Sequence, residues 1–367
     1  MKKKYFIIII IFTMLSISGA AVALYWPKLS PPKKVKVSPK KKETPNITVP
    51  EVKLPEAYCP LDDESTTAQN SMRRPLAVMI ENHPDARPQS GLTKACIVYE
   101  TVAEGGITRF LAIYVHNDVR NIGPVRSARS YFVDLAKQYN AIYAHCGGPT
   151  TIHNIIRRLG VADLDEFANS KAYWRVKTRH APHNLYTSTD RLIAGAQARK
   201  YDTNLNTARL SFKEDVTIDL RPAGASIDID FSKAESKVRY VYDRQTNQYN
   251  RLMAGQPHVD ADTNQQIAPK NVIVQYVSIS KIANDIKGRM QVDLVGSGKA
   301  VVFQDGAVIQ AIWQRPTVGS ITRYYDLSGS EIKLNRGQTW IELVDPYDMK
   351  VNYQIVPMGA TAAPTGN

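Results

Sequence analysis

The feature that most limits the fold is a series of short apolar runs between Arg73 and Asn184, separated by polar motifs that contain glycine or proline. Short apolar runs bounded by such residues are typical of β-strands joined by turns. Four runs fit this pattern: residues 75–80, 95–101, 109–115 and 141–144. Residues 130–139 and 150–159 instead have the spacing and end signals of helices. Residues 73–200 therefore predict an α/β domain with a mixed sheet and helices.

The second half of the chain has a different pattern. From Ser226 onward, short β-rich runs alternate with glycine or asparagine. This pattern predicts a predominantly antiparallel β domain over residues 226–357. Residues 201–225 form a transition, and residues 358–367 a flexible tail. The sequence leaves open whether the second domain folds by itself or completes the first sheet.

The N-terminus contains an uncharged run from Tyr5 to Trp26 that is long enough to cross a bilayer as a helix. We expect residues 1–26 to be an uncleaved signal anchor, although residues 21–23 resemble a cleavage site. The lysine- and proline-rich residues 27–72 predict an extended linker.

The flanking charges give conflicting signals on orientation. Lysines are more numerous after the apolar run than before it, which argues against export. A short basic N-terminus before an apolar core is, however, the ordinary export pattern. We therefore expect a single-pass anchor in the cell membrane, with the globular part outside the cytoplasm.

Most of the positive charge belongs to the N-terminal region. Residues 1–58 contain eleven lysines and three glutamates, which supply +8 of the net charge of +13. The excess therefore does not predict a basic groove, and we expect no nucleic-acid partner. Lysines clustered beside a membrane anchor are suited to anionic lipid headgroups or wall polymers.

The chain has three cysteines that are far apart: Cys59, Cys96 and Cys146. Their spacing implies neither a disulfide framework nor a metal site of the CxxC type, although one pair could still form a bridge. Cys96 lies within an apolar run, which favours the role of a small buried hydrophobic residue.

Several longer strings are more specific than any single motif. They cover residues 74–83, 87–92, 98–100, 104–111, 123–129 and 181–186 in the first half, and 255–260, 271–275, 296–299 and 338–341 in the second. Together they resemble the YerB family of bacterial lipoproteins, which come mostly from Gram-positive organisms. The resemblance implies an extracytoplasmic, membrane-attached envelope protein with this two-block layout, and it implies no reaction and no catalytic residue.

The chain departs from the lipoprotein pattern at its N-terminus. Its first cysteine is Cys59, well beyond the apolar run. A helical anchor therefore takes the place of lipid attachment in this interpretation.

Carboxylates stand at predicted strand ends in the first domain. Glu104 precedes two glycines after an apolar run, and partial burial would raise its pKa and suit it to general acid catalysis. Glycoside cleavage needs a second carboxylate, for which Glu100 and Glu81 are available. The alternative is that Glu104 forms a structural ion pair with Arg109 or Arg126.

Arginines in turn-like settings predict an anion site. Arg126 and Arg129 lie after a Gly-Pro pair and directly before a predicted helix, so their guanidinium groups and nearby N–H groups could meet one phosphate or carboxylate. Arg87 and Arg109 lie in similar motifs. The alternative is that these arginines bind carbonyl oxygens or Asp134.

Six of the seven histidines lie between Arg73 and Asn184. His183 and Asn184 are candidates for a polarising or general-base pair, with a hydrogen-bonded structural histidine as the alternative. His180 is three residues from His183, but the proline between them interrupts the helix that a metalloprotease motif needs. His83 and His145 could complete a zinc set, yet no further signal supports it, so we predict no metal and no cofactor.

The leading hypothesis is an envelope protein that binds an anionic wall glycan or a peptidoglycan fragment in an Arg/His/Glu cleft, with hydrolysis left open. The predicted site has Glu104, His183 and Glu100 as catalytic residues, and Arg87, Arg109, Arg126, Arg129 and Asn184 as ligand-binding residues. One alternative is a non-catalytic module that regulates a membrane-bound wall-synthesis protein through the β-rich half. The other is a metal-dependent phosphodiester hydrolase.

Overall fold

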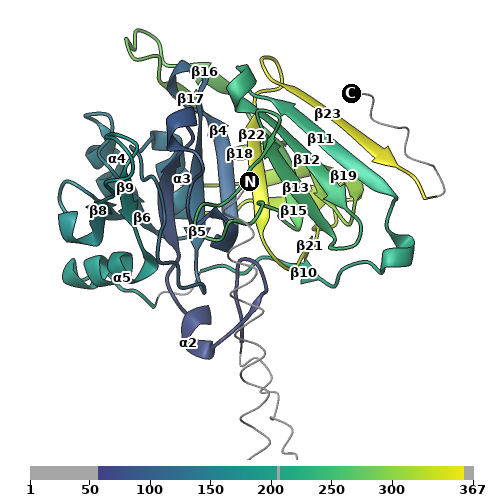
Figure 1. Ribbon diagram of the computed structural model, residues 1–367, viewed down its shortest axis with the longest axis horizontal. Helices are drawn as coiled ribbons and strands as arrows, with labels where there is room; N and C mark the ends of the chain where they lie inside the picture. The colour runs from purple at the N-terminus through teal and green to yellow at the C-terminus, as the bar shows by residue number, and fades with distance from the viewer. Residues whose placement is uncertain (1–56, 205–206, 359–367) are drawn as a thin grey trace, which may run out of the picture. The chain divides into compact units, whose positions relative to one another are not determined.

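A ten-stranded mixed sheet forms the centre of the protein, and both halves of the chain contribute strands to it (Figure 1). The computed structural model describes residues 57–204 and 207–358. The strand order is β20-β19-β18-β15-β22-β4-β5-β3-β6-β7. The first half supplies β3 (Leu76–Glu81), β4 (Ile97–Val102), β5 (Thr108–Tyr114), β6 (Ile142–His145) and β7 (Ala162–Asp165). The second half supplies β15 (Asn271–Tyr276), β18 (Gly296–Gln304), β19 (Ala307–Arg315), β20 (Arg323–Asp326) and β22 (Thr339–Val344).

The second half completes the sheet of the first half, which answers the question that the sequence left open. β22 lies between β15 and β4 and pairs with both in parallel. All residues of β3, β4, β5 and β22 are buried, as expected for strands that are covered on both faces. The predicted mixed sheet is therefore larger than one domain.

Helices cover the first half of this sheet. They are α3 (Ser130–Gln138), α4 (Ile152–Leu159) and α5 (Thr189–Ala198), and Figure 1 shows all three in the part of the molecule that contains β6. The two predicted helices match α3 and α4, and the four predicted strands match β3 to β6. The sequence-based prediction has no counterpart of α5, whose N-cap Ser188 accepts a hydrogen bond from the backbone N–H of Arg191.

A second sheet of five antiparallel strands belongs wholly to the second half. Its order is β14 (Gln256–Pro257), β13 (Gln248–Met253), β12 (Lys237–Asp243), β11 (Gly224–Asp230) and β23 (Lys350–Val356). Buried and more exposed residues alternate along β11, β12 and β13, because one face packs on the core. Its antiparallel pairing agrees with the predominantly antiparallel pattern predicted for residues 226–357.

Four short strand pairs complete the architecture. They are β1 (Ala57–Tyr58) with β2 (Ser65–Thr66), β8 (Tyr173–Arg175) with β9 (Leu185–Thr187), β10 (Phe212–Lys213) with β21 (Leu334–Asn335), and β16 (Ile279–Lys281) with β17 (Met290–Val292). The β1–β2 hairpin and α2 (Ala68–Ser71) differ from the extended linker predicted for residues 27–72. Their elements are too short to show a periodic sequence pattern, and the turn residues Cys59 and Leu61 are fully buried.

In the ranges 57–204 and 207–358, no helix has the length and apolar character needed to cross a membrane. The anchor predicted over residues 1–26 lies outside those ranges, as do residues 27–56 of the predicted linker and residues 359–367 of the predicted tail.

A buried ion pair joins the two sheets. Arg251 on β13 contacts Glu100 on β4, and both side chains are fully buried. Glu100 also accepts hydrogen bonds from Asn82 Nδ2 at 3.3 Å and from Thr108 Oγ1 at 2.5 Å. The Arg251 guanidinium lies 4.3 Å from the centre of the Trp340 ring. These contacts satisfy two charges that would otherwise be costly to bury.

Two other ionisable groups beside Arg251, Glu342 and His258, are held in their neutral forms. Burial, together with the negative charge of Glu100, raises the pKa of Glu342 well above its ordinary value. Burial, together with the positive charge of Arg251, lowers the pKa of His258 well below its ordinary value. Tyr240 donates a hydrogen bond to Glu342, and His258 Nε2 lies 2.9 Å from Gln89 Oε1. The single positive charge of Arg251 therefore faces a single carboxylate, Glu100.

We predict that Arg251→Met destabilises the protein by about 3–5 kcal/mol, because it leaves the Glu100 carboxylate buried without its partner. Glu342→Gln is the matched control, since it replaces a protonated carboxyl group by a neutral amide in the same network. The free energy of unfolding, measured by urea titration with circular dichroism, should fall much less in that control. Equal losses in the two variants would contradict the assignment of the charges.

Candidate functional site

A polar cavity of about 370 Å³ lies where β3 and β4 end and the antiparallel β5 begins. Its charged lining comes from several separate segments: Glu81, Glu104, Arg109, Arg126, Arg129, Lys287 and Arg289. The last two belong to the loop between β16 and β17 in the second half of the chain. The sheet topology thus brings together loops that lie far apart in the sequence.

Glu104 forms a bidentate ion pair with Arg129. Arg129 Nε and one terminal nitrogen each lie 2.5 Å from a different carboxylate oxygen of Glu104. Arg109 approaches the same carboxylate at 3.8 Å and donates a hydrogen bond to the Ser127 carbonyl at 3.0 Å. Gly105 follows with a φ of 69°, a left-handed conformation that glycine adopts readily and that turns the chain back into β5.

Glu81 is the second carboxylate of the cavity. It ends β3 and lies 2.9 Å from Arg126 Nε and 2.8 Å from His183 Nδ1. The His183 ring stacks on the His83 ring at a centroid distance of 4.9 Å. Glu81 therefore connects the segment before α3 with the turn that carries His183.

The ionisation of Glu104 differs from the prediction. Burial raises its pKa, but hydrogen bonds from Arg129 and the charges of Arg129 and Arg109 outweigh burial and leave the pKa below the ordinary value. Glu104 is therefore a carboxylate at neutral pH, and the raised pKa expected of a general acid is wrong. Burial and the positive charge of Arg129 lower the pKa of Arg109 to about 10, so the guanidinium remains charged at neutral pH.

Comparison with known families identifies the chain. The family model described as "Protein of unknown function (DUF3048) N-terminal domain" matches residues 63–202, and its C-terminal counterpart matches residues 227–341. The chain belongs to the DUF3048 family.

Two related findings connect this family with YerB. The Bacillus subtilis (strain 168) protein named "Putative lipoprotein YerB" is 36% identical over 297 residues, covering 79% of this chain and 86% of that protein. The crystal structure of the YerB protein from Bacillus subtilis has a TM-score of 0.73 and 32% identity, and the match covers 80% of this chain and 99% of that chain. The resemblance seen in the sequence is confirmed.

The DUF3048 fold brings four of the predicted residues to one cavity and a fifth to its rim. Glu104, Arg109, Arg126 and Arg129 line the cavity, and His183 contacts it through Glu81. The ion pair of Glu104 with Arg109 is also the alternative that the sequence left open, although Arg129 is its main partner.

Three predicted residues lie elsewhere. Glu100 is fully buried in the ion pair with Arg251, so it does not face a ligand in the cavity. Arg87 donates hydrogen bonds to Asn82 and to the Glu235 carbonyl, so it connects the two halves of the chain. The Asn184 side chain bonds with Arg175 and with the Val176 carbonyl. Periodicity could not reveal these contacts, because their partners lie on other strands and loops.

The histidines divide into separate groups. His83, Asp85 and His183 have potential ligand atoms within 4.8 Å of one another, next to Glu81. His145 instead lies 2.9 Å from Asp163, apart from this group. The zinc set with His83 and His145, which the sequence raised as an alternative and did not predict, is therefore not assembled among the described residues.

A larger hollow of about 800 Å³ lies in the second half. Its lining includes Tyr276, Trp313, Tyr347 and Tyr353, with Asp293 and Lys299 as charged residues. We place the candidate site in the smaller cavity, because charged side chains from both halves converge there.

We predict that Glu104→Gln lowers the free energy of unfolding by about 1–3 kcal/mol at pH 7, since it removes a charge-assisted contact with Arg129. Because the folded-state pKa of Glu104 is below the ordinary value of 4.5, its contribution is present above that pH and is lost as the pH falls through the folded-state pKa. The difference from the wild type should therefore shrink as the pH falls below 4.5 and the Glu104 carboxylate takes up a proton.

Urea unfolding at a series of pH values measures this difference. Glu214→Gln is the control for net charge, because the Glu214 side chain is 79% exposed and its ion pair with Arg336 is solvent-exposed, so the pair contributes little to stability. A difference between Glu104→Gln and the wild type that grows on acidification would contradict the lowered pKa.

Proposed function

We propose that this DUF3048 protein is a membrane-associated extracytoplasmic protein of the cell envelope whose polar cavity binds an anionic group of a wall polymer or peptidoglycan fragment. The relative named as a lipoprotein supports the location, and the sequence supports it through the basic N-terminus and its apolar run. The charge of the cavity supports the ligand class.

The excess of positive charge in the cavity carries this proposal. Five cationic side chains line it: Arg109, Arg126, Arg129, Lys287 and Arg289. The acidic lining residues are Glu81 and Glu104, so the described lining has more positive than negative groups. A phosphate or carboxylate would balance this excess of positive charge, and arginine can bind either group through bidentate hydrogen bonds.

The electrostatics of the arginines point in the same direction. The charges of Arg129 and Arg126 both help to lower the pKa of Arg109, which means that the three guanidinium groups repel one another. A bound anion would relieve this repulsion. Arginines that surround an open cavity are thus prepared for a negatively charged ligand.

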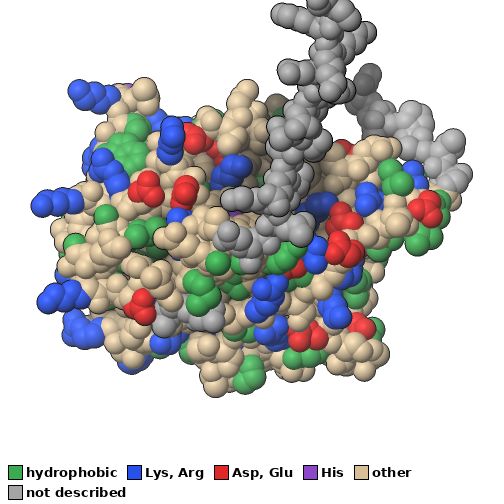
Figure 2. Space-filling model, turned by 90° about the horizontal axis from the view of Figure 1, so that it is seen from below, with side chains coloured by type: hydrophobic (Ala, Val, Ile, Leu, Met, Phe, Trp, Pro, Cys, Tyr) green, Lys and Arg blue, Asp and Glu red, His purple; other side chains and the backbone are tan. Residues whose placement is uncertain are grey.

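The face seen in Figure 2 lacks the uniform positive charge of a general polyanion-binding surface. On the face seen in Figure 2, lysine and arginine side chains are interspersed with aspartate and glutamate. A mixed surface of this kind gives weak long-range attraction for a polymer at physiological salt. The cavity is therefore the better candidate for specific recognition.

The contacts of the carboxylates favour binding over hydrolysis. Glu104 is ionised by its contact with Arg129, and Glu100 is enclosed in the buried network. Glycoside cleavage commonly needs a protonated carboxyl and a second free carboxylate on either side of the bond. We therefore propose recognition of the polymer as the main role of the cavity.

The other two hypotheses would use different surfaces. Docking of a wall-synthesis protein would use the aromatic hollow, where the Tyr347 side chain is 93% exposed. Metal-dependent phosphodiester cleavage would use His83, Asp85 and His183. Neither has the convergence of charges that favours the anion site.

We predict that the full chain binds purified wall teichoic acid or soluble muropeptides, and that binding weakens as salt is increased. Lys287→Ala should weaken binding by about two- to fivefold, because an exposed cation at the cavity is lost. Lys287 is exposed, and the ion pairs of the described residues do not include it, so its removal leaves no buried carboxylate behind. Isothermal titration calorimetry in detergent measures the affinities.

Lys281→Ala is the matched control, since Lys281 is an exposed lysine in the same hairpin but outside the cavity lining. Its affinity should remain that of the wild type. Binding of the phosphate polymer alone would identify phosphate as the recognised group, and binding of muropeptides alone would identify carboxylate. Absence of binding to both ligands would refute the proposed function.

A further inference from the structure

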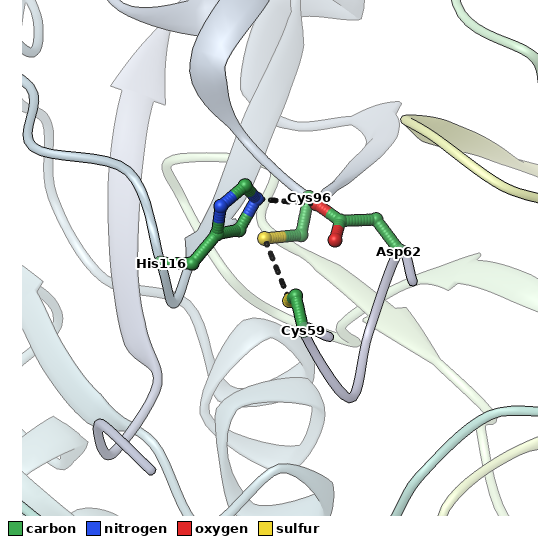
Figure 3. A group of neighbouring side chains, drawn as sticks. All are labelled: Cys59, Asp62, Cys96 and His116. Carbon is green, nitrogen blue, oxygen red and sulfur yellow. Dashed lines mark hydrogen bonds and ion pairs between the residues drawn. The ribbon is translucent and has the colours of Figure 1, made fainter. Parts of the chain in front are cut away.

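Four potential metal ligands from three separate segments meet in the interior, away from the polar cavity (Figure 3). Cys59 and Asp62 lie in the turn between β1 and β2, Cys96 directly precedes β4, and His116 follows the end of β5. Their exposed fractions lie between 0% and 7%. Figure 3 shows the four side chains pointing toward one another.

The strand pairing explains why these residues meet. β4 and β5 are antiparallel, with Ile97 opposite Ile113, so the start of β4 lies beside the end of β5. The Cys96 backbone N–H donates to the Ile113 carbonyl at 2.8 Å, which fixes Cys96 near the segment that carries His116. The β1–β2 turn then closes over this end of the strand pair.

The distances fit a tetrahedral metal site. All four ligand atoms lie within 4.8 Å of one another. Cys59 Sγ and Cys96 Sγ are 3.8 Å apart, and two thiolates that each lie 2.3 Å from a zinc ion in a tetrahedron are separated by about 3.8 Å. His116 Nε2 lies 3.1 Å from Asp62 Oδ2, close to the separation of about 3.4 Å that tetrahedral nitrogen and oxygen ligands have.

The separation of 3.8 Å between Cys59 Sγ and Cys96 Sγ is also much longer than a disulfide bond, in which the two sulfur atoms are about 2.05 Å apart. The chemistry of the set also selects among metals. Two sulfur ligands with one imidazole and one carboxylate suit zinc, whereas calcium and magnesium prefer oxygen ligands only. Zinc sites with four protein ligands are closed and structural rather than catalytic.

Neighbouring backbone groups support the negative charge of such a site. The Leu61 N–H donates to Cys59 Sγ at 3.5 Å, and the Glu64 N–H donates to Asp62 Oδ1 at 3.2 Å. Hydrogen bonds of this kind orient metal ligands and stabilise them as anions.

We propose that Cys59, Asp62, Cys96 and His116 form a structural zinc site that fastens the β1–β2 hairpin to the β4–β5 end of the large sheet. On binding, the two thiol groups release their protons to solvent, and each sulfur donates an electron pair to the ion. The hairpin is the first described element of the chain. The site would therefore hold this hairpin against the core of the large sheet.

The test uses the full chain, reduced and purified in detergent without chelator. We expect one zinc ion per chain by elemental analysis after incubation with zinc and gel filtration. Titration with cobalt should give one equivalent of binding and the thiolate-to-cobalt charge-transfer absorption of a tetrahedral site. Zinc should displace the cobalt, and removal of zinc should lower the Tm.

Variants assign the metal to this cluster. Cys96→Ser should abolish the two-thiolate spectrum, and Asp62→Asn should weaken cobalt binding at least about tenfold, the lower end of the loss caused by outer-shell substitutions. Cys146→Ser is the matched control, because Cys146 lies near Glu166 and outside the cluster, and it should bind as the wild type does. His183→Ala is the second control and should also retain the metal, since it alters the other histidine group.

The wild-type cobalt titration does not depend on the folding of any variant. Failure of the reduced wild type to bind cobalt or zinc would overturn the proposal. Loss of the metal in His183→Ala with retention in Cys96→Ser would also overturn it. A third contrary outcome is protein isolated without reductant that has a mass two hydrogens lower, with the bridge assigned to Cys59 and Cys96. If that protein also failed to bind zinc after reduction, the two cysteines would form a disulfide and not a metal site.

Discussion

The ion pair between Arg251 and Glu100 is the interaction on which the arrangement of the two halves depends. Arg251 comes from the antiparallel sheet of the second half, and Glu100 comes from a central strand of the large sheet. Both groups are fully buried. A partial separation of the sheets would therefore break the ion pair without giving either charge access to water, which is energetically costly. Asn82, which bonds with Glu100, directly follows Glu81 of the cavity. Thr108 donates to Glu100 and also lines the cavity. The network thus holds one wall of the polar cavity in place.

Three glutamates show how the environment decides the role of the same side chain. Glu100 forms a buried ion pair with Arg251, Glu342 in the same network is protonated, and Glu104 in the cavity is ionised against Arg129. Burial alone favours the neutral form of a carboxyl group. At Glu104 the hydrogen bonds and the charge of Arg129 reverse this preference. The positive charge left in the cavity after these pairings is the basis for proposing an anionic ligand.

Local patterns predicted much of the first half, because strand runs and helix ends depend on neighbouring residues. The grouping of Glu104, Arg126 and Arg129 could also be anticipated, since Glu104 follows a predicted strand and the two arginines lie between a Gly-Pro pair and a predicted helix. Lys287 and Arg289 could not, because the β16–β17 loop meets the cavity only through the tertiary fold. Nor could the insertion of β22 beside β4, which depends on pairing over more than two hundred residues. Glu100 was misplaced for the same reason: its partner Arg251 lies on another sheet.

The polar cavity and the proposed zinc site occupy opposite ends of the β4–β5 pair. Cys96 precedes β4 and His116 follows β5, whereas Glu104 follows β4 and Arg109 lies at the beginning of β5. A strand of six residues separates the two ends by about 20 Å. Groups so far apart, with no shared partner, generally contribute independently to stability and binding. The metal would therefore stabilise the attachment of the β1–β2 hairpin, and the charges around Glu104 would separately serve the proposed recognition of a ligand. Both sites belong to one continuous sheet.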